Sequence, residues 1–338
     1  MMITIVFLAI LISTNAYSVC IVQNKGGGHG ELGFHLAKDL IKNGKANDIT
    51  ILQDTAAKMS SQPFCEYTSL TNVNIMPCDL SDTTAVESAL NGKSYKYMID
   101  NFSKDISTVE TLLKCSEDYL YVSSGGMYKG DCPSTGHTES DDVKSDNACR
   151  VIEEYLSSDA SGTVPFSSFR PQYIYGTNTN KRGNLDYFYD RISRDIPVPI
   201  PGDGTQLIAL TNAADVAAGI TSVIESNASS KDGSIFNLGT DKFISYNDLV
   251  DEVAKSLGKS SAEKAYYDPK SLDFKPAFPF RPKTFTVDPS KLKATTGWSI
   301  ASDLVSDLNN VWVKQYMDGG FASKDLSESL EKDKLIFA

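Results

Sequence analysis

Positive charge is scarce in this chain. Of its 338 residues, 32 are Lys or Arg and 43 are Asp or Glu, so the net charge is −11. This surplus of acid excludes a protein that binds nucleic acid through a basic surface spread over the whole molecule, but it allows a local groove where cations gather. The proportions of hydrophobic residues (41%) and charged residues (22%) are those of a globular protein and exclude low-complexity disorder.

Histidine and closely spaced cysteine are also rare. The chain has three histidines, and its six cysteines include no CxxC pair, so a zinc site is not expected. Cys20 and Cys78 fall in or beside predicted buried strands, where a free thiol behaves as a small hydrophobic group. We therefore expect free thiols in a reducing compartment.

Long hydrophobic runs are missing. The run over residues 3–12 is too short to cross a bilayer, and no run of about 18 apolar residues follows it. Residues 1–18 are predicted to be a signal or targeting segment, although no Lys or Arg precedes Lys25. The alternative is that they form the first strand and its lead-in.

What the chain has is a regular alternation of apolar runs and amphipathic stretches. Predicted strands cover residues 19–23, 49–52, 73–76, 97–99, 119–123 and 166–169, and predicted helices cover residues 32–43, 82–90, 108–114 and 149–156. This order predicts an α/β fold, a Rossmann-type doubly wound parallel sheet with helices on both faces.

After residue 176, short Pro- and Gly-rich strands alternate with helices, which are predicted over residues 215–225, 246–257 and 302–316. We expect a dinucleotide-binding-like domain over residues 19–176 and a smaller α/β lobe over residues 177–320, interleaved with the edge of the sheet. Residues 321–338 are charged and are expected to be a solvated end.

A glycine-rich turn is the first candidate site. Gly27, Gly30 and Gly33 follow the first predicted strand and open a helix. In that context glycines let backbone N–H groups approach a pyrophosphate at the helix N-terminus. The alternative is a tight turn that binds nothing.

A dinucleotide site also needs an acid after the second strand, to bind the ribose hydroxyls. Gln53 stands directly after that strand and Asp54 one position later, which leaves the choice of cofactor open. Asp79 follows the third strand, where it could meet an adenine or simply cap the next helix.

Several motifs further along resemble the extended short-chain dehydrogenase/reductase superfamily, which includes NAD-dependent sugar-nucleotide epimerases and dehydratases. They are Tyr-Val-Ser-Ser-Gly-Gly-Met-Tyr at 121–128, Arg-Pro-Gln-Tyr-Ile-Tyr-Gly at 170–176, Pro-Gly-Asp-Gly at 201–204, Asn-Leu-Gly at 237–239 and Gly-Trp at 297–298. The resemblance implies the Rossmann fold, an NAD(P) cofactor and a serine at or near Ser123 or Ser124 in the catalytic region.

The catalytic pair of that superfamily, a Tyr and a Lys four residues later, does not stand in the matching region, 141–155. Arg150 takes the place of the Lys and Asp146 the place of the Tyr. An ionised Asp cannot reproduce the proton chemistry of a phenol. Hydride-transfer catalysis by the usual route is therefore not expected.

The ways in which this sequence differs from the superfamily pattern are similar to those of the chloroplast stem-loop RNA-binding proteins, an atypical branch of the superfamily. The similarity rests on Gly-Gly-His at 27–29, Asp-Asn-Phe-Ser-Lys-Asp at 100–105, Val-Pro-Ile-Pro-Gly at 198–202 and Pro-Ala-Phe-Pro-Phe-Arg at 276–281. It implies binding to plastid transcripts at stem-loops. In some members it also implies association with ribosomes or an endonuclease that would need Mg²⁺. We also expect an oligomer.

An RNA surface would have to use local clusters of cations. The candidates are Lys181, Arg182, Arg191, Arg194, Arg281 and Lys283. Aromatic residues stand among them, at 187, 189, 266, 267, 278 and 280, and could stack bases. The alternative is that these aromatics fill the core of the smaller lobe.

Three functions therefore stay open at this point. They are plastid RNA binding, an NAD(P)-dependent epimerase, dehydratase or reductase with unusual residues, and a non-catalytic nucleotide sensor or assembly factor. A signal-like leader directly before the fold favours a plastid reached through the secretory route, whose stroma would keep thiols reduced. Plain secretion is the alternative.

Overall fold

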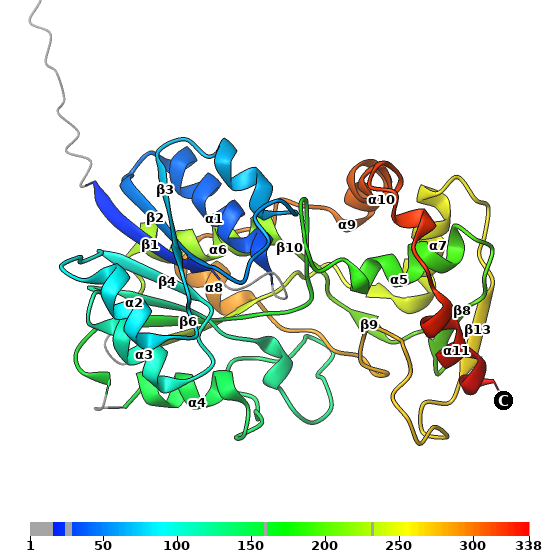
Figure 1. Ribbon diagram of the computed structural model, residues 1–338. Coiled ribbons are helices and arrows are strands. Elements are labelled where there is room, and N and C mark those ends of the chain that lie inside the picture. Colours follow the sequence, from blue (N-terminus) through cyan, green and yellow to red (C-terminus); the bar gives the residue numbers. More distant parts are fainter. Residues whose placement is uncertain (1–15, 24–28, 159–160, 231–232, 338) are drawn as a thin grey trace, which may run out of the picture.

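A parallel sheet lies at the centre of the larger lobe of the molecule (Figure 1). The computed structural model describes residues 16–23, 29–158, 161–230 and 233–337. Within these residues seven strands pair in the order β11-β6-β5-β4-β1-β2-β3, and every pair is parallel. The strands are β1 (Tyr17–Gln23), β2 (Ala46–Asp54), β3 (Val73–Cys78), β4 (Tyr97–Asn101), β5 (Tyr119–Val122), β6 (Phe166–Pro171) and β11 (Ser234–Leu238). The predicted Rossmann-type fold is confirmed.

Helices cover both faces of this sheet. One face carries α1 (Gly30–Asn43), α6 (Ala213–Ser226) and α8 (Ser290–Thr296), and the other carries α2 (Thr83–Leu90), α3 (Ile106–Leu113) and α4 (Ala148–Leu156). Strands between two helical layers are buried on both sides, which explains why they read as continuous apolar runs rather than alternating ones.

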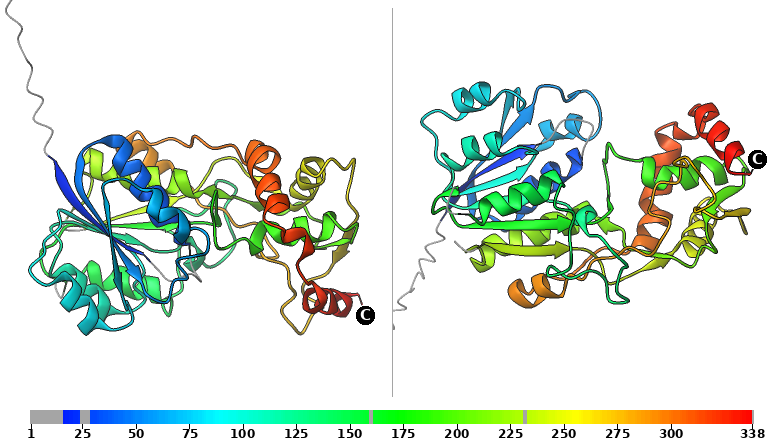
Figure 2. Two further views of the ribbon diagram at one scale, coloured as in Figure 1. Left: turned by 45° about the horizontal axis from the view of Figure 1, so that its top comes forward. Right: turned by 90° about the horizontal axis from the view of Figure 1, so that it is seen from below.

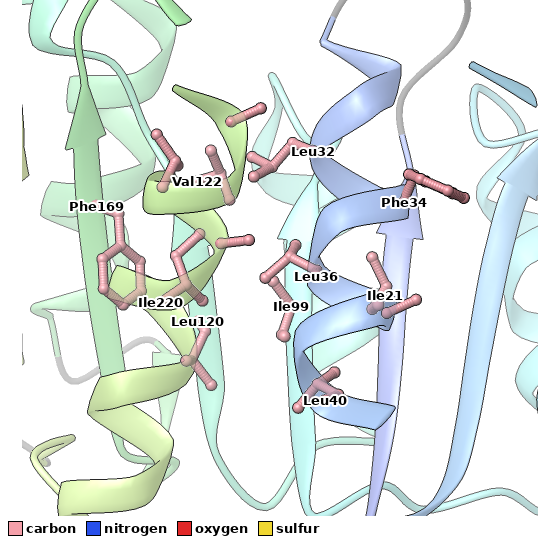
Figure 3. Close-up of a cluster of buried hydrophobic side chains, with 14 of the residues drawn as sticks. Ile21, Leu32, Phe34, Leu36, Leu40, Ile99, Leu120, Val122, Phe169 and Ile220 are labelled. Carbon is pink, nitrogen blue, oxygen red and sulfur yellow. The ribbon is translucent and has the colours of Figure 1, made fainter. Parts of the chain in front are cut away.

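Figure 3 shows how α1 is fixed to the sheet. Leu32, Leu36 and Leu40 recur every four residues, so they lie on one face of the helix. That face is fully buried against the strands and against Ile220 of α6. Residues far apart in the sequence therefore share one core.

A second lobe lies beside the sheet (Figure 2). Its strands pair two by two: β8 (Val198–Pro201) with β13 (Lys264–Tyr267), and β9 (Leu207–Ile208) with β12 (Ile244–Ser245). Its helices include α5 (Gly183–Ile192), α7 (Tyr246–Ser256), α9 (Leu304–Asp307), the π-helical turn η4 (Leu308–Trp312) and α10 (Val313–Asp318). Short pieces β7 (Ile174–Tyr175) and β10 (Thr211–Asn212) pair where the chain passes between the lobes.

The aromatic residues of the second lobe mostly fill its core. Tyr187, Tyr189, Phe278 and Phe280 are buried in one cluster with ring-to-ring contacts, whereas Tyr266 is 49% exposed. The buried four are therefore not free to stack on bases, which favours the core alternative for them.

The C-terminal segment packs on the second lobe. Residues 321–323 form the short turn η5 (Phe321–Ser323), and α11 (Ser327–Ile336) follows it. Arg191 of α5 bonds Asp333 of α11 at 2.7 Å, and Arg194 donates to the carbonyl oxygens of Ala322 and Lys324. The charged segment thus forms a helix that docks on the second lobe, while most of its side chains stay exposed.

The leader prediction falls mostly outside the described residues, which begin at residue 16, and β1 already starts at Tyr17. All six cysteines are free, as expected. In the part of the chain that the structure describes, no helix has the length and apolar character needed to cross a bilayer.

Candidate nucleotide-binding site

A cavity of about 460 Å³ lies between the two lobes, at the carboxyl ends of β4, β5 and β6. Open parallel sheets bind ligands at this edge. Its lining residues are His29, Asn101, Lys104, Val122, Ser123, Ser124, Gly126, Pro171, Gln172, Tyr173, Ile174, Lys181, Asn184, Pro279, Arg281 and Phe285. No Asp or Glu stands among these sixteen described residues, although the chain as a whole is acidic.

Three cations line the cavity, each held differently. The Lys104 ammonium donates to the Cys149 thiol at 3.3 Å. Arg281 donates to the carbonyl oxygens of Gly126 (2.6 Å) and Tyr128 (3.2 Å). Lys181 is exposed and, within the described residues, has no carboxylate at ion-pair distance. The cavity therefore carries positive charge that the protein does not neutralise.

Two buried polar side chains of the cavity each have an oxygen without a partner in the described structure. Ser123 is 6% exposed and Gln172 is 2% exposed. The Ser123 hydroxyl and the Gln172 Oε1 make no hydrogen bond, while the Gln172 amide nitrogen donates to the Phe285 carbonyl oxygen. Buried polar atoms without a partner are costly, and both of these atoms are covered too closely for solvent to reach them.

Tyr173, which also lines the cavity, has a strained backbone. Its φ of +40° lies in the left-handed region, which bulky side chains rarely adopt. The ring packs edge-on against Phe280 at 4.8 Å, and the hydroxyl accepts a bond from the Arg281 backbone N–H at 3.2 Å. Burial raises the pKa of the Tyr173 hydroxyl above its ordinary value. Strain of this kind gathers at functional sites.

The glycine turn lies at the entrance to α1. Gly27 is outside the described residues. The Gly30 N–H donates to Asn180 Oδ1 at 3.1 Å, and a Cβ at Gly30 would lie 2.6 Å from Phe64 Cζ. A Cβ at Gly33 would lie 2.1 Å from Gln23 Oε1, so Gly33 permits the close approach of α1 and β1. The described glycines thus serve close packing.

The residues predicted to bind the ribose (Gln53, Asp54) or to meet the adenine (Asp79) lie at the ends of β2 and β3. Gln53 is 2% exposed, and its Oε1 has no partner in the described structure. Asp54 accepts from the Ala56 N–H at 2.6 Å. Asp79 is exposed and accepts from Ser81, so it closes a turn. Asp82, not Asp79, caps α2.

These residues fit a dinucleotide incompletely. Gln53 Oε1 is a buried acceptor without a partner in the described structure, near the end of β2, the strand after which this fold places its ribose-binding residue. The first N–H of α1, however, is taken by Asn180, and the side chain of Phe64 packs against Gly30. Both occupy the helix end where a pyrophosphate would approach.

The degenerate catalytic positions do not come together. Asp146 is exposed, and Arg150 bonds Glu154 at 2.9 Å along α4. Neither lines the cavity, whereas Ser123 and Ser124 do. Ser124 accepts from the Gly126 N–H and so caps the turn η2 (Gly125–Met127).

The predicted RNA-contacting cations divide into two sets. Lys181 and Arg281 line the cavity, and Lys283 is exposed beside it, bonded to the Gly130 carbonyl oxygen and 3.5 Å from Asp131. These three stand where a phosphate could reach them.

The other three are engaged inside the second lobe. Arg182 bonds Asp186 and lies over the Trp312 ring, Arg191 is 1% exposed, and Arg194 holds the C-terminal segment. A cation that is already paired and largely buried is poorly placed to contact a phosphate, so we leave these three out of the proposed surface.

Sequence reasoning missed Lys104, Gln172, Tyr173 and His29 as lining residues. A signal existed, since each directly follows the end of a strand or lies in the loop behind it, where the fold gathers its ligands. Among the described residues, no three His, Cys, Asp or Glu side chains come together as a metal site would require.

The chain is similar to known proteins over most of its length. It is 29% identical over 308 residues to the chloroplast stem-loop binding protein of 41 kDa b from Arabidopsis thaliana, covering 87% of this chain and 79% of that protein. The resemblance to that protein group is confirmed.

Solved structures share the fold at lower identity. The dTDP-glucose 4,6-dehydratase of Bacillus anthracis, in complex with NAD, matches with a TM-score of 0.71 and 14% identity, over 90% of this chain and 98% of that one. The UDP-glucose 4-epimerase of Thermus thermophilus, also with NAD, matches with a TM-score of 0.66 and 20% identity, over 89% and 99%.

A family model also matches this chain, over a range that includes the cavity-lining ends of β4, β5 and β6 and the strand β11. It describes the NAD dependent epimerase/dehydratase family and matches residues 26–239, more than half of the chain. The chain therefore belongs to the NAD-dependent epimerase/dehydratase family.

Proposed function

We propose that this protein binds RNA of the plastid at the cavity between its lobes. The observation that carries the proposal is the charge of the lining, three cations and no carboxylate among sixteen described residues, in a chain of net charge −11. The net negative charge of the chain repels a phosphate backbone, whereas the cations of this lining attract it. The local charge thus selects one place of contact.

The relative from Arabidopsis supports the kind of partner. Its name describes a chloroplast protein that binds stem-loops, and it matches 87% of this chain. A plastid location for this chain rests on that similarity. Ribosome association and self-association remain expectations of the resemblance.

The test is the affinity for a plastid stem-loop RNA, measured by fluorescence anisotropy at several salt concentrations. The double variant Lys181→Ala/Arg281→Ala should bind more weakly, because two phosphate contacts are lost. The slope of log affinity against log salt should fall by about 1.4 to 1.8, at roughly 0.7 to 0.9 for each contact.

A matched control is Lys42→Ala. Lys42 is an exposed lysine in the last turn of α1, about 18 Å along the helix from Gly30 and at the other edge of the sheet. It should leave affinity and salt slope as they are. If the double variant behaves like this control, RNA is not bound at the cavity.

A second candidate function is binding of a nicotinamide dinucleotide. It is favoured by the buried acceptor on Gln53, which has no partner in the described structure, and by the NAD held in solved members of the fold. Calorimetric titration with NAD⁺ and NADP⁺ tests it, with Gln53→Leu expected to lose any binding. Absence of heat in the wild-type protein would remove this candidate.

A further inference from the structure

We infer that His29 bonds an RNA phosphate in the cavity, and that it does so only as an imidazolium paired with the buried carboxylate of Glu31. This inference rests on the proposed RNA binding and adds to it a contact that depends on pH. His29 lines the cavity together with Lys104, Lys181 and Arg281. Its side chain keeps 22% of its surface exposed, so a ligand can reach it.

The Glu31 carboxylate is fully buried in the first turn of α1, where it bonds the His29 ring. Its Oε1 lies 2.9 Å from His29 Nδ1, whereas its Oε2 has no partner in the described structure. A buried carboxylate with a single partner is costly unless that partner carries the opposite charge. Protonation of His29 turns the contact into an ion pair, so the burial of Glu31 favours the charged form of the ring.

The bond to Glu31 also decides which ring nitrogen is left for a ligand. An ionised carboxylate only accepts, so Nδ1 of His29 carries a hydrogen in both states of the ring. Nε2 points away from this bond, and the described structure records no partner for it. Nε2 is therefore a donor when the ring is charged and an acceptor when it is neutral. A phosphate oxygen only accepts, so it can bond Nε2 only in the charged form.

The backbone groups that adjoin the ring are engaged, so the ring is the group that this segment offers to the cavity. The Gly30 N–H donates to Asn180. The carbonyl oxygen of His29 accepts from the side-chain amides of Asn101 and Gln23, at the ends of β4 and β1. These bonds hold His29 at the carboxyl edge of the sheet, where this fold binds its ligands.

The charges around His29 act on its proton in opposite directions. The start of α1 carries a positive charge of roughly half a unit, and Lys104, Lys181 and Arg281 add full charges to the cavity. All of these oppose an imidazolium in the empty cavity, whereas the carboxylate of Glu31 at 2.9 Å favours it. A phosphate that enters offsets the cations and bonds Nε2, so binding should draw a proton onto the ring.

Two other titratable groups lie close to the charge of Glu31, and neither explains a change in the range of about pH 5 to 8 where a histidine exchanges its proton. His35 bonds a backbone carbonyl oxygen, and burial lowers its pKa, which favours the neutral ring. Burial raises the pKa of Tyr67, in the turn η1 (Phe64–Ser69), so this phenol stays protonated. The Cys149 thiol, which is bonded to a lysine of the cavity, is unchanged in the variants described below.

The experiment measures the affinity for a plastid stem-loop RNA by fluorescence anisotropy at about pH 6 and about pH 8. Wild-type protein should bind about tenfold more tightly at the lower pH, because only there does Nε2 of His29 donate to a phosphate. The salt slope should also be larger at the lower pH, by roughly 0.7 to 0.9, because one more charged contact is made. Lys42→Ala, at the far end of α1, should keep both differences.

Two variants test the roles of the pair. In His29→Asn the shorter amide can still bond Glu31, but it places nothing at the position of Nε2. Its affinity at both pH values should therefore be that of the wild type at the higher pH. Glu31→Gln keeps an acceptor for Nδ1 and removes the charge, so the gain at the lower pH should shrink while the affinity at the higher pH is not reduced. A merely structural role of Glu31 would reduce the affinity at both.

Calorimetry of the wild-type protein adds a measurement that needs no variant. RNA is titrated into the protein at about pH 7, in two buffers with different ionisation enthalpies. The difference in heat gives the number of protons taken up. A fraction of one proton per complex is expected, because the bound phosphate favours the charged form of His29.

Equal affinity of the wild type at both pH values overturns the role of His29, while the salt-dependent binding proposed above can still stand. Binding without proton uptake overturns it too, and so does a preference for the lower pH that survives in His29→Asn. Failure to bind RNA at either pH, or binding unaffected by Lys181→Ala/Arg281→Ala, overturns the proposed function itself.

Discussion

Asp118 carries a carboxyl group that the fold buries without hydrogen bonds to both of its oxygens. It lies just before β5, at the sheet edge opposite the cavity, and is 9% exposed. Its Oδ1 has no hydrogen-bond partner in the described structure. Burial raises its pKa from 3.8 to about 6, which a hydrogen bond from Ser229 offsets only in part.

The shift makes stability depend on pH. Below pH 3.8 the carboxyl is protonated in both the folded and the unfolded protein, and its contribution is most favourable there. That contribution is lost as pH rises through about 6, where the folded protein must bury a charge. Asp118→Asn should therefore raise the free energy of unfolding by about 1 to 3 kcal/mol above that pH.

Urea unfolding of the Asp118→Asn variant and the wild type at about pH 4 and about pH 8 checks this expectation. The increase in the free energy of unfolding should be large at the higher pH and small at the lower pH. The same gain at both would show that the charge of Asp118 is not its cause.

Gly33 is a position where a methyl group has no room. A Cβ there would lie 2.1 Å from Gln23 Oε1 and 2.9 Å from the Tyr67 hydroxyl. Gly33→Ala should lower the free energy of unfolding by about 1 to 3 kcal/mol, because α1 must move from β1. Gly183→Ala on α5 has no atom within 4 Å of the added Cβ and is the matched control.

Thermal melts of the two glycine variants give the comparison. The control should stay within about 0.5 kcal/mol of the wild type or gain slightly, because Ala favours helix. Equal losses in both variants would show that the crowding at Gly33 relaxes easily.

Single residues also show how far the site follows from the sequence. The glycine spacing locates the start of α1, but it cannot tell whether a glycine makes room for a ligand or for Phe64. Lys181 and Arg191 look alike in the sequence, yet one lines the cavity and the other is buried against Asp333. Burial of a cation depends on which distant segment packs on it, which no local pattern contains.

At the scale of elements, α11 is attached to the second lobe by a buried ion pair. Arg191 on α5 also donates to the Tyr187 carbonyl oxygen and to Ser329, so its guanidinium is fully engaged. Burial raises the pKa of Asp333, and Arg191 only partly offsets this. The pair thus fixes where α11 docks more than it adds stability.

Removing one partner of the Arg191–Asp333 pair should lower the free energy of unfolding more than replacing both partners. Asp333→Ala leaves a buried guanidinium without its carboxylate and should lower the free energy of unfolding by about 3 kcal/mol. The double variant Arg191→Met/Asp333→Leu should recover most of this loss. Urea unfolding measures both, and a double variant no more stable than Asp333→Ala would contradict the expectation.

The helices and strands could be predicted well from the local sequence, because apolar runs and helix caps are local features. The predicted strand 166–169 and helix 246–257 lie within about two residues of β6 and α7. The predicted helix at 302–316 is instead divided into α9, the π-helical η4 and α10. Leu308 and Trp312 of this wider turn are buried in the core of the second lobe, so its packing depends on other segments of the chain.

At the scale of the whole molecule, the chain crosses between the lobes several times. After α5 and β8 it returns to the sheet with α6 and β11, and it returns again with α8. A fragment ending at residue 176 therefore lacks the helix that covers α1 and the strand that pairs with β6. Such a fragment should be poorly packed, with weak near-ultraviolet circular dichroism and rapid proteolysis, whereas the full chain resists both.

The pairing of α1 with α6 has a consequence for biosynthesis. Leu32, Leu36 and Leu40 are made early, but their partner helix begins only at Ala213. At roughly 5 to 20 residues per second, a ribosome would need about 10 to 40 s to supply it. During that interval the leucine face of α1 is open to other apolar surfaces, so a newly made chain should depend on chaperones until α6 has emerged.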